Sequence, residues 1–143
     1  MTRVDFYVVP EDSGQDVVPT VCRLCDKGTQ QGQRLYLAVA DAELAQRLDD
    51  ALWSFRQGSF IAHERLGAAP PLPPLPAVLL GSGEPPAEYS GVMINLCADV
   101  PAFFSRFERV LEIVCGDAAG RQRSRERYRF YRDRGYPLVS HSL

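Results

Sequence analysis

The chain has 143 residues, of which 45% are hydrophobic and 24% are charged, and its net charge at pH 7 is −2. This length and composition are typical of one globular domain with a core of its own, and they exclude a disordered chain. No apolar run approaches the roughly 18 residues of a membrane helix, and the first residues lack the segments of a signal peptide, so we expect a cytoplasmic protein with no membrane partner.

The first half of the chain alternates predicted strands and helices. "VDFYVV" at 4–9 consists of β-branched and aromatic residues and predicts a buried strand. Apolar residues at helical spacing predict a helix over 16–30, in which Pro19 is tolerated because it falls in the first turn. "RLYLAVA" at 34–40 predicts a second strand, and Asp41 can cap the helix predicted for "DAELAQRLDDALWSF".

The next part of the chain is organised around a proline-dense segment. "SFIAH" at 59–63 predicts a strand, and "GVMINLC" at 91–97 predicts another. Seven of the eleven prolines lie between positions 70 and 86, so the 68–86 segment is predicted to be a stiff surface connection around one short strand, "AVLL".

The last third of the chain is predicted to contain two helices. One starts at Pro101 and has Phe104, Phe107, Leu111 and Val114 along its buried face. The other is rich in arginine and covers about 118–134, and a possible edge strand, "PLVSHS", follows it.

Continuously apolar strands separated by amphipathic helices indicate a mostly parallel sheet with helices on both faces. We therefore predict a single, doubly wound α/β domain over residues 1–143, Rossmann-like in its layers. Such folds often bind ligands at the carboxyl ends of their strands.

Motifs of enzyme active sites are missing from the sequence. "LLGSGEPP" has two glycines of a dinucleotide fingerprint but not the third, and the sole lysine, Lys27, does not lie in a P-loop. Cys22 and Cys25 form a CxxC, but "TVCRLCDKG" looks helical and has no second cysteine pair, so packing is favoured over zinc or redox chemistry. We expect no enzymatic activity, no cofactor and no metal; a nucleotide-binding or enzymatic α/β domain is the alternative.

Positive charge is concentrated near the C-terminus. Residues 1–120 carry nine basic and sixteen acidic side chains, a net −7, whereas residues 121–143 carry seven arginines and two acidic residues, a net +5. On a helix, Arg121, Arg125, Arg129 and Arg132 fall within about 80° of one another, with Tyr128 beside them. The other three arginines, Arg123, Arg127 and Arg134, lie on a different side.

The ligand predicted for this stripe of arginines is an anion. The acidic body would repel a long polyanion such as DNA, so a short acidic peptide with an apolar end fits better. Direct binding of single-stranded DNA through phosphate contacts and stacking is a further alternative.

Three stretches resemble the chi subunit of the bacterial DNA polymerase III holoenzyme: "RERYRFYRDRGY", "DDALWSF" with Phe60 seven residues after Trp53, and the opening "DFYVV". The resemblance runs over essentially the whole chain. It implies a non-catalytic accessory subunit of the clamp loader, acting in DNA replication, which joins the psi subunit to the acidic C-terminal tail of single-stranded DNA-binding protein. That tail ends in an apolar residue with a free carboxylate.

The resemblance also implies roles for particular residues. Tail binding is expected at Arg121, Arg125 and Tyr128, with Val114 as a pocket wall, and the stripe adds Arg129 and Arg132. Contact with psi is expected at Trp53 and Phe60, although a lone tryptophan at a helix end would otherwise indicate a core residue. The implied protein is a monomer or a heterodimer with psi, and it meets nucleic acid only indirectly.

Overall fold

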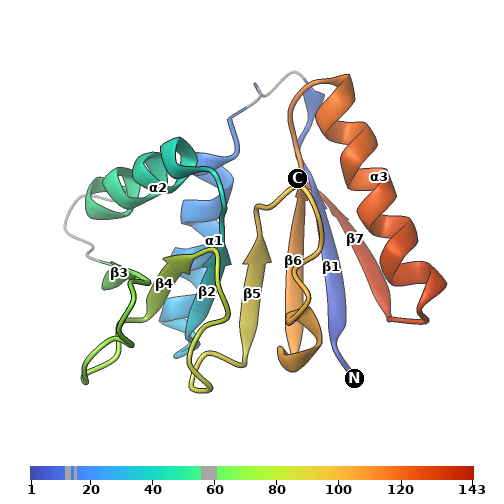
Figure 1. Ribbon diagram of the computed structural model, residues 1–143. Coiled ribbons are helices and arrows are strands. Elements are labelled where there is room, and N and C mark those ends of the chain that lie inside the picture. Colours follow the sequence, from blue (N-terminus) through green and yellow to red (C-terminus); the bar gives the residue numbers. More distant parts are fainter. Residues whose placement is uncertain (12–13, 15, 56–60) are drawn as a thin grey trace.

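Seven parallel strands form one sheet at the centre of the computed structural model, which describes residues 1–11, 14, 16–55 and 61–143 (Figure 1). In chain order the strands are β1 (Arg3–Val8), β2 (Leu35–Ala38), β3 (His63–Arg65), β4 (Val78–Gly81), β5 (Val92–Asn95), β6 (Arg109–Val114) and β7 (Leu138–Ser142). Their order across the sheet is β3-β4-β2-β5-β6-β1-β7, and every neighbouring pair is parallel. This arrangement confirms the predicted doubly wound α/β fold.

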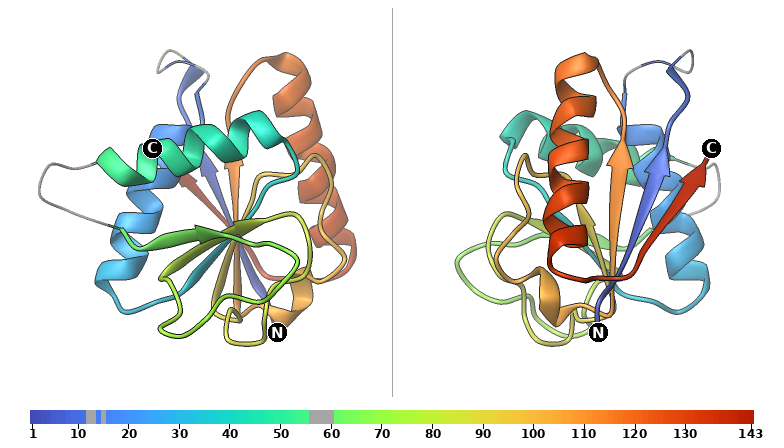
Figure 2. Two further views of the ribbon diagram at one scale, coloured as in Figure 1. Left: turned by 60° about the vertical axis from the view of Figure 1, so that its left-hand side comes forward. Right: turned by 90° about the vertical axis from the view of Figure 1, so that its right-hand side faces the viewer.

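Helices cover both faces of the sheet (Figure 2). Helices α1 (Val18–Gln30) and α2 (Ala42–Ser54) lie on one face, and α3 (Ala118–Asp133) lies on the other. The buried side chains accordingly form two clusters, one containing Leu48 of α2 and the other containing Tyr131 of α3. No helix in the described part of the chain has the length and hydropathy that a membrane crossing requires.

Local capping explains where two of the helices begin. The Asp41 carboxylate accepts hydrogen bonds from the backbone N–H groups of Glu43 and Leu44, at 2.9 and 3.2 Å, as its position before α2 predicted. Asp117 caps α3 in the same way through the N–H of Gly120 at 2.9 Å. Both helices therefore start at residues whose side chains satisfy otherwise unpaired backbone donors.

The prediction of a helix that starts at Pro101 is wrong. A short 3₁₀ turn, Phe104–Arg106, is followed by strand β6. The apolar residues looked like the buried face of a helix because β6 lies between β5 and β1, where both faces of the sheet are covered. A strand in that place is apolar throughout. Phe107 in fact packs in the cluster under α3, whereas Leu111 packs in the cluster on the opposite face.

Two predicted strands differ less from the structure. The strand predicted at 59–63 lies at His63–Arg65, and residues 59–60 are outside the described part of the chain. The possible edge strand near the C-terminus is confirmed as β7, which pairs only with β1 among the described strands.

A buried carboxylate joins α3 to the sheet. Glu112 of β6 has no solvent exposure and accepts hydrogen bonds from Asn95 Nδ2 at 2.9 Å, Tyr131 Oη at 2.7 Å and Arg127 Nε at 2.9 Å. Burial raises the pKa of Glu112, while Arg127 and the other donors act to lower it. Because two of the three donors belong to α3, this network fixes the helix against β6.

A second buried carboxylate holds the edge of the sheet on the opposite face. Asp5 of β1 is fully buried and contacts Arg109 Nε at 2.6 Å, Arg3 at 2.9 Å and His141 Nε2 at 2.9 Å. Burial alone would raise the pKa of Asp5, but the hydrogen bonds from Arg109, His141 and Arg3 outweigh it and hold that pKa below its ordinary value. Since His141 belongs to β7, Asp5 ties the edge strand to its neighbours.

Removing one donor of the Glu112 network should destabilise the protein. In Tyr131→Phe the buried carboxylate loses one of its partners, so we expect the free energy of unfolding to fall by about 1 to 3 kcal/mol in urea titrations. Tyr136→Phe is the matched control, because the Tyr136 hydroxyl has no hydrogen bond among the described residues. Equal losses in the two variants would contradict the role given to Glu112.

Replacing Asp5 should change how the free energy of unfolding depends on pH in the acidic range. A lowered pKa in the folded state stabilises the protein above the ordinary aspartate pKa of about 3.9, and this stabilisation is lost as the pH falls through and below that value. Asp5→Asn should therefore lower the free energy of unfolding at pH 7 by about 2 kcal/mol, less than for a fully buried pair because Arg3 and Arg109 are partly exposed. The difference in the free energy of unfolding between Asp5→Asn and wild type should become smaller towards pH 3. A difference that is the same at pH 7 and pH 3 would contradict the lowered pKa of Asp5.

Candidate functional site

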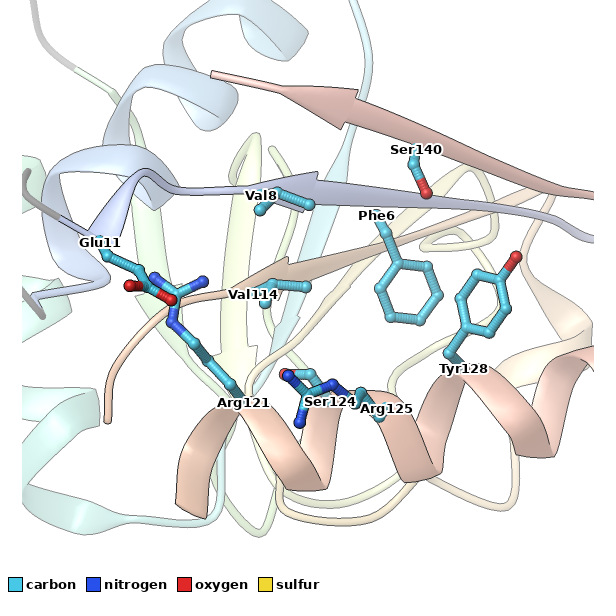
Figure 3. A pocket seen from close by; sticks show the side chains of 9 residues that line it. All are labelled: Phe6, Val8, Glu11, Val114, Arg121, Ser124, Arg125, Tyr128 and Ser140. Carbon is cyan, nitrogen blue, oxygen red and sulfur yellow. The ribbon is translucent and has the colours of Figure 1, made fainter. Parts of the chain in front are cut away.

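An open pocket lies between α3 and the sheet. Its volume is about 290 Å³, and four elements line it (Figure 3). The residues that line it are Phe6 and Val8 of β1, Glu11 just after β1, Val114 of β6, Arg121, Ser124, Arg125 and Tyr128 of α3, and Ser140 of β7. We call it the α3 pocket.

The floor and walls of the α3 pocket are mostly apolar. Phe6 and Val8 point from β1 towards α3, because alternate residues of a strand face the same side of the sheet. The Phe6 and Tyr128 rings meet edge to face with their centroids 5.2 Å apart. An apolar side chain can therefore be buried between the helix and the strand.

The rim of the α3 pocket carries positive charge. Arg121 donates to the backbone carbonyls of Val9 at 2.9 Å and Gly116 at 3.2 Å, which fix its guanidinium without neutralising it. Arg125 is exposed and donates to the amide oxygen of Gln122 at 3.1 Å, again a neutral acceptor. Both guanidinium groups can therefore form charge-assisted hydrogen bonds with a carboxylate.

One lining residue carries negative charge. Glu11 stands at the rim near the end of β1, on the side towards which Arg121 points (Figure 3). No salt bridge to Glu11 is formed within the described part of the chain. This carboxylate sets a limit to how far an acidic ligand can extend towards the end of β1.

The structure brings together four of the six residues predicted for tail binding. Val114, Arg121, Arg125 and Tyr128 all line the α3 pocket. Two predicted residues lie outside its lining: Arg129 is exposed farther along α3, and Arg132 is paired with Asp133 at 3.1 Å.

Of the strand residues that line the α3 pocket, sequence reasoning gave Val114 and missed Phe6, Val8 and Ser140. The alternation in "DFYVV" was a signal that Phe6 and Val8 share a face, but it did not show which face α3 covers. Ser140 had no signal at all, because its place depends on β7 pairing in parallel with β1, 134 positions away in the register Phe6↔Ser140.

The other arginines of α3, and Arg134 just after it, have different surroundings. Arg127 is bound to Glu112, and Arg134 lies over the ring of Phe130 with its guanidinium carbon 3.6 Å from the centroid. Arg123 is exposed and borders a separate groove on the other side of α3. The seven arginines thus divide between structural contacts and the solvent-facing sides of the helix.

Trp53 lies far from the α3 pocket along the chain, at the end of α2. Trp53 is 59% exposed, and it is the only Phe, Trp or Tyr in the described part of the chain that is exposed and not buried or half-buried. Its ring meets His63 edge to face with the centroids 5.0 Å apart. Phe60, predicted to act with Trp53, lies outside the described residues.

Three of the four cysteine thiols, Cys22, Cys25 and Cys97, have raised pKa values, which disfavours the nucleophilic thiolate. Burial raises the pKa of Cys22 to about 11, and burial also raises the pKa values of Cys25 and Cys97. Within the described ranges, no group of three or more His, Cys, Asp or Glu side chains is placed to hold a metal ion.

Comparison with known proteins gives the family. The family model described as "DNA polymerase III chi subunit, HolC" matches residues 1–139. The DNA polymerase III subunit chi of Pseudomonas aeruginosa is 43% identical over 143 residues, covering 100% of this chain and 98% of the relative. The subunit chi of Escherichia coli is 28% identical over 142 residues, covering 96% of each chain, and that of Haemophilus influenzae is 25% identical over 138 residues, covering 96% and 95%. With its parallel α/β fold and a match over nearly its whole length, the chain belongs to the DNA polymerase III chi subunit family.

Proposed function

We propose that this chain is a non-catalytic, cytoplasmic subunit of the DNA polymerase III holoenzyme that binds the acidic C-terminal tail of single-stranded DNA-binding protein in the α3 pocket. Through a second surface around Trp53 it would bind the psi subunit and so link the tail to the clamp loader. The chain then acts as an adaptor between two proteins and contacts nucleic acid only indirectly.

The observation that carries the proposal is the pairing of an open apolar pocket with two guanidinium groups, those of Arg121 and Arg125, that form no salt bridge within the described part of the chain. A peptide that ends in an apolar residue presents a side chain and a carboxylate at one point. The space between Phe6, Val114 and Tyr128 suits the side chain, and Arg121 and Arg125 suit the carboxylate.

The distribution of charge favours a short ligand over DNA. Residues 1–120 carry a net −7, so a long polyanion that left α3 would meet an acidic surface. A short acidic tail can stay within reach of α3. Because the rim arginines are partly exposed, its affinity should decrease as the ionic strength rises.

The exposed surface of Trp53 supports the second half of the proposal. A large aromatic side chain that is 59% exposed at a helix end is unusual in a folded domain, and such residues are enriched at the centres of protein interfaces. His63 supports one edge of the Trp53 ring, so the ring is partly held in place before a partner binds.

Arg125→Ala tests the tail site. Loss of a charge-assisted hydrogen bond should weaken binding of a synthetic acidic peptide with an apolar C-terminal residue about tenfold, measured by fluorescence anisotropy. Arg123→Ala is the matched control, because it removes the same charge from the same helix outside the pocket. Equal weakening by both variants would show that only the overall charge of α3 matters, and a peptide with an amidated C-terminus should bind worse to wild type.

Trp53→Ala tests the psi surface. Truncation of a hot-spot aromatic residue costs about 2 kcal/mol or more, so the dissociation constant for purified psi subunit should rise about 30-fold in calorimetric titrations. Tail-peptide binding should not change. Val139→Ala, an exposed apolar residue at the opposite edge of the sheet, should leave the affinity for psi unaltered; undiminished psi binding by Trp53→Ala would remove Trp53 from the interface.

A further inference from the structure

Strand β7 is an edge of the sheet with one side unpaired. It forms its ladder with β1, and no other strand in the described part of the chain lies beyond it (Figure 2, right). An unpaired edge presents backbone N–H and C=O groups to which another chain can add as a further strand.

The hydrogen bonds to β1 show which groups of β7 face outwards. The N–H of Val4 donates to the Pro137 carbonyl at 2.9 Å, and the N–H of Leu143 donates to the Val8 carbonyl at 3.1 Å. In a parallel ladder alternate residues of a strand bond to the same neighbour, so Val139 and His141 also face β1. The N–H and C=O groups of Leu138, Ser140 and Ser142 therefore point away from the sheet.

The two edges of the sheet are built differently. Edge strand β3 has three residues, of which Glu64 and Arg65 are charged and exposed, and charged side chains on a short strand discourage pairing. Edge strand β7 has five residues, "LVSHS", without Asp, Glu, Lys, Arg, Pro or Gly. Of the two edge strands among the described residues, β7 is therefore the one better suited to pair with an added strand.

The open edge of β7 adjoins the α3 pocket. Ser140 lines the pocket and projects towards Tyr128, so its outward amide lies beside the space proposed for the apolar end of the tail (Figure 3). Helix α3 and β7 are joined by a short turn and run in opposite directions. Arg125, Arg129 and Arg132 follow one another along α3 at one-turn spacing from the pocket towards the start of β7.

We propose that the acidic tail binds as an added strand parallel to β7, with its backbone bonded to the outward groups of Leu138, Ser140 and Ser142. This inference rests on the proposed tail site and deepens it. In the parallel orientation the terminal carboxylate reaches Arg121 and Arg125, and the acidic residues before it run towards Arg129 and Arg132. The two arginines that lie outside the pocket lining thereby gain contacts with the ligand.

Amide hydrogen exchange, followed by NMR, tests the added strand in the unmodified chain. When a synthetic acidic peptide with an apolar C-terminal residue saturates the chain, the amides of Ser140 and Ser142 should exchange at least tenfold more slowly. The amides of Val139 and His141, already bonded to β1, should not change. Binding that leaves Ser140 and Ser142 unprotected would overturn the added strand alone, whereas no binding at all would overturn the proposed function as well.

A pair of variants at one position separates the backbone from the side chain. Ser140→Pro removes the outward N–H of residue 140, and an edge strand tolerates proline at such a position. This variant should bind the peptide at least tenfold more weakly than wild type. Ser140→Ala keeps the amide and should bind within about twofold of wild type. If both variants have the melting temperature of wild type and bind the peptide with equal affinity, the added strand is also overturned. If Ser140→Pro does not fold, the amide-exchange experiment on the unmodified chain decides.

Discussion

The carboxylate of Glu112, fully buried on the inner strand β6, fixes the arrangement on which the proposed binding site depends. A buried carboxylate needs donors, and Asn95 of β5 and Arg127 and Tyr131 of α3 provide them. Two donors one turn apart leave α3 little freedom to rotate or slide over β6. With Arg127 and Tyr131 directed at Glu112, helical geometry turns Arg121, Ser124 and Tyr128 towards β1, and these side chains close the α3 pocket.

The same network explains why so many arginines on one helix do not act alike. Arg127 is only 12% exposed in its side chain, and its charge is balanced by Glu112. Arg134 is held over Phe130. Arg121 is anchored by backbone carbonyls, which orient the guanidinium but leave its charge available. The positive charge offered to a ligand is therefore set by which side of α3 faces the sheet and not by the number of arginines.

Much of the fold could be predicted from the sequence, because most strands are continuous apolar runs and Asp41 marks the start of α2. The region after Pro101 could not, since a strand buried on both faces and a buried helix have similar apolar content over six residues. For the site, helical periodicity alone placed Arg121 and Arg125 beside Tyr128. Phe6, Val8 and Ser140 required the order of the strands and their register, which are set by long-range pairing.

Contacts on one face of the sheet fix the position of strand β7, and its other face borders the α3 pocket. On the face opposite α3, His141 contacts the buried Asp5 and stacks on Tyr7 with the ring centroids 4.7 Å apart. These contacts fix the position of an edge strand that has a neighbour on one side only. On the α3 face, Ser140 is thereby set in place in the unbound chain, so the proposed peptide would order its own backbone but not that of β7. Because the loss of freedom on binding opposes affinity, the contacts of His141 with Asp5 and Tyr7 support the proposed site, although none of these three residues lines the α3 pocket.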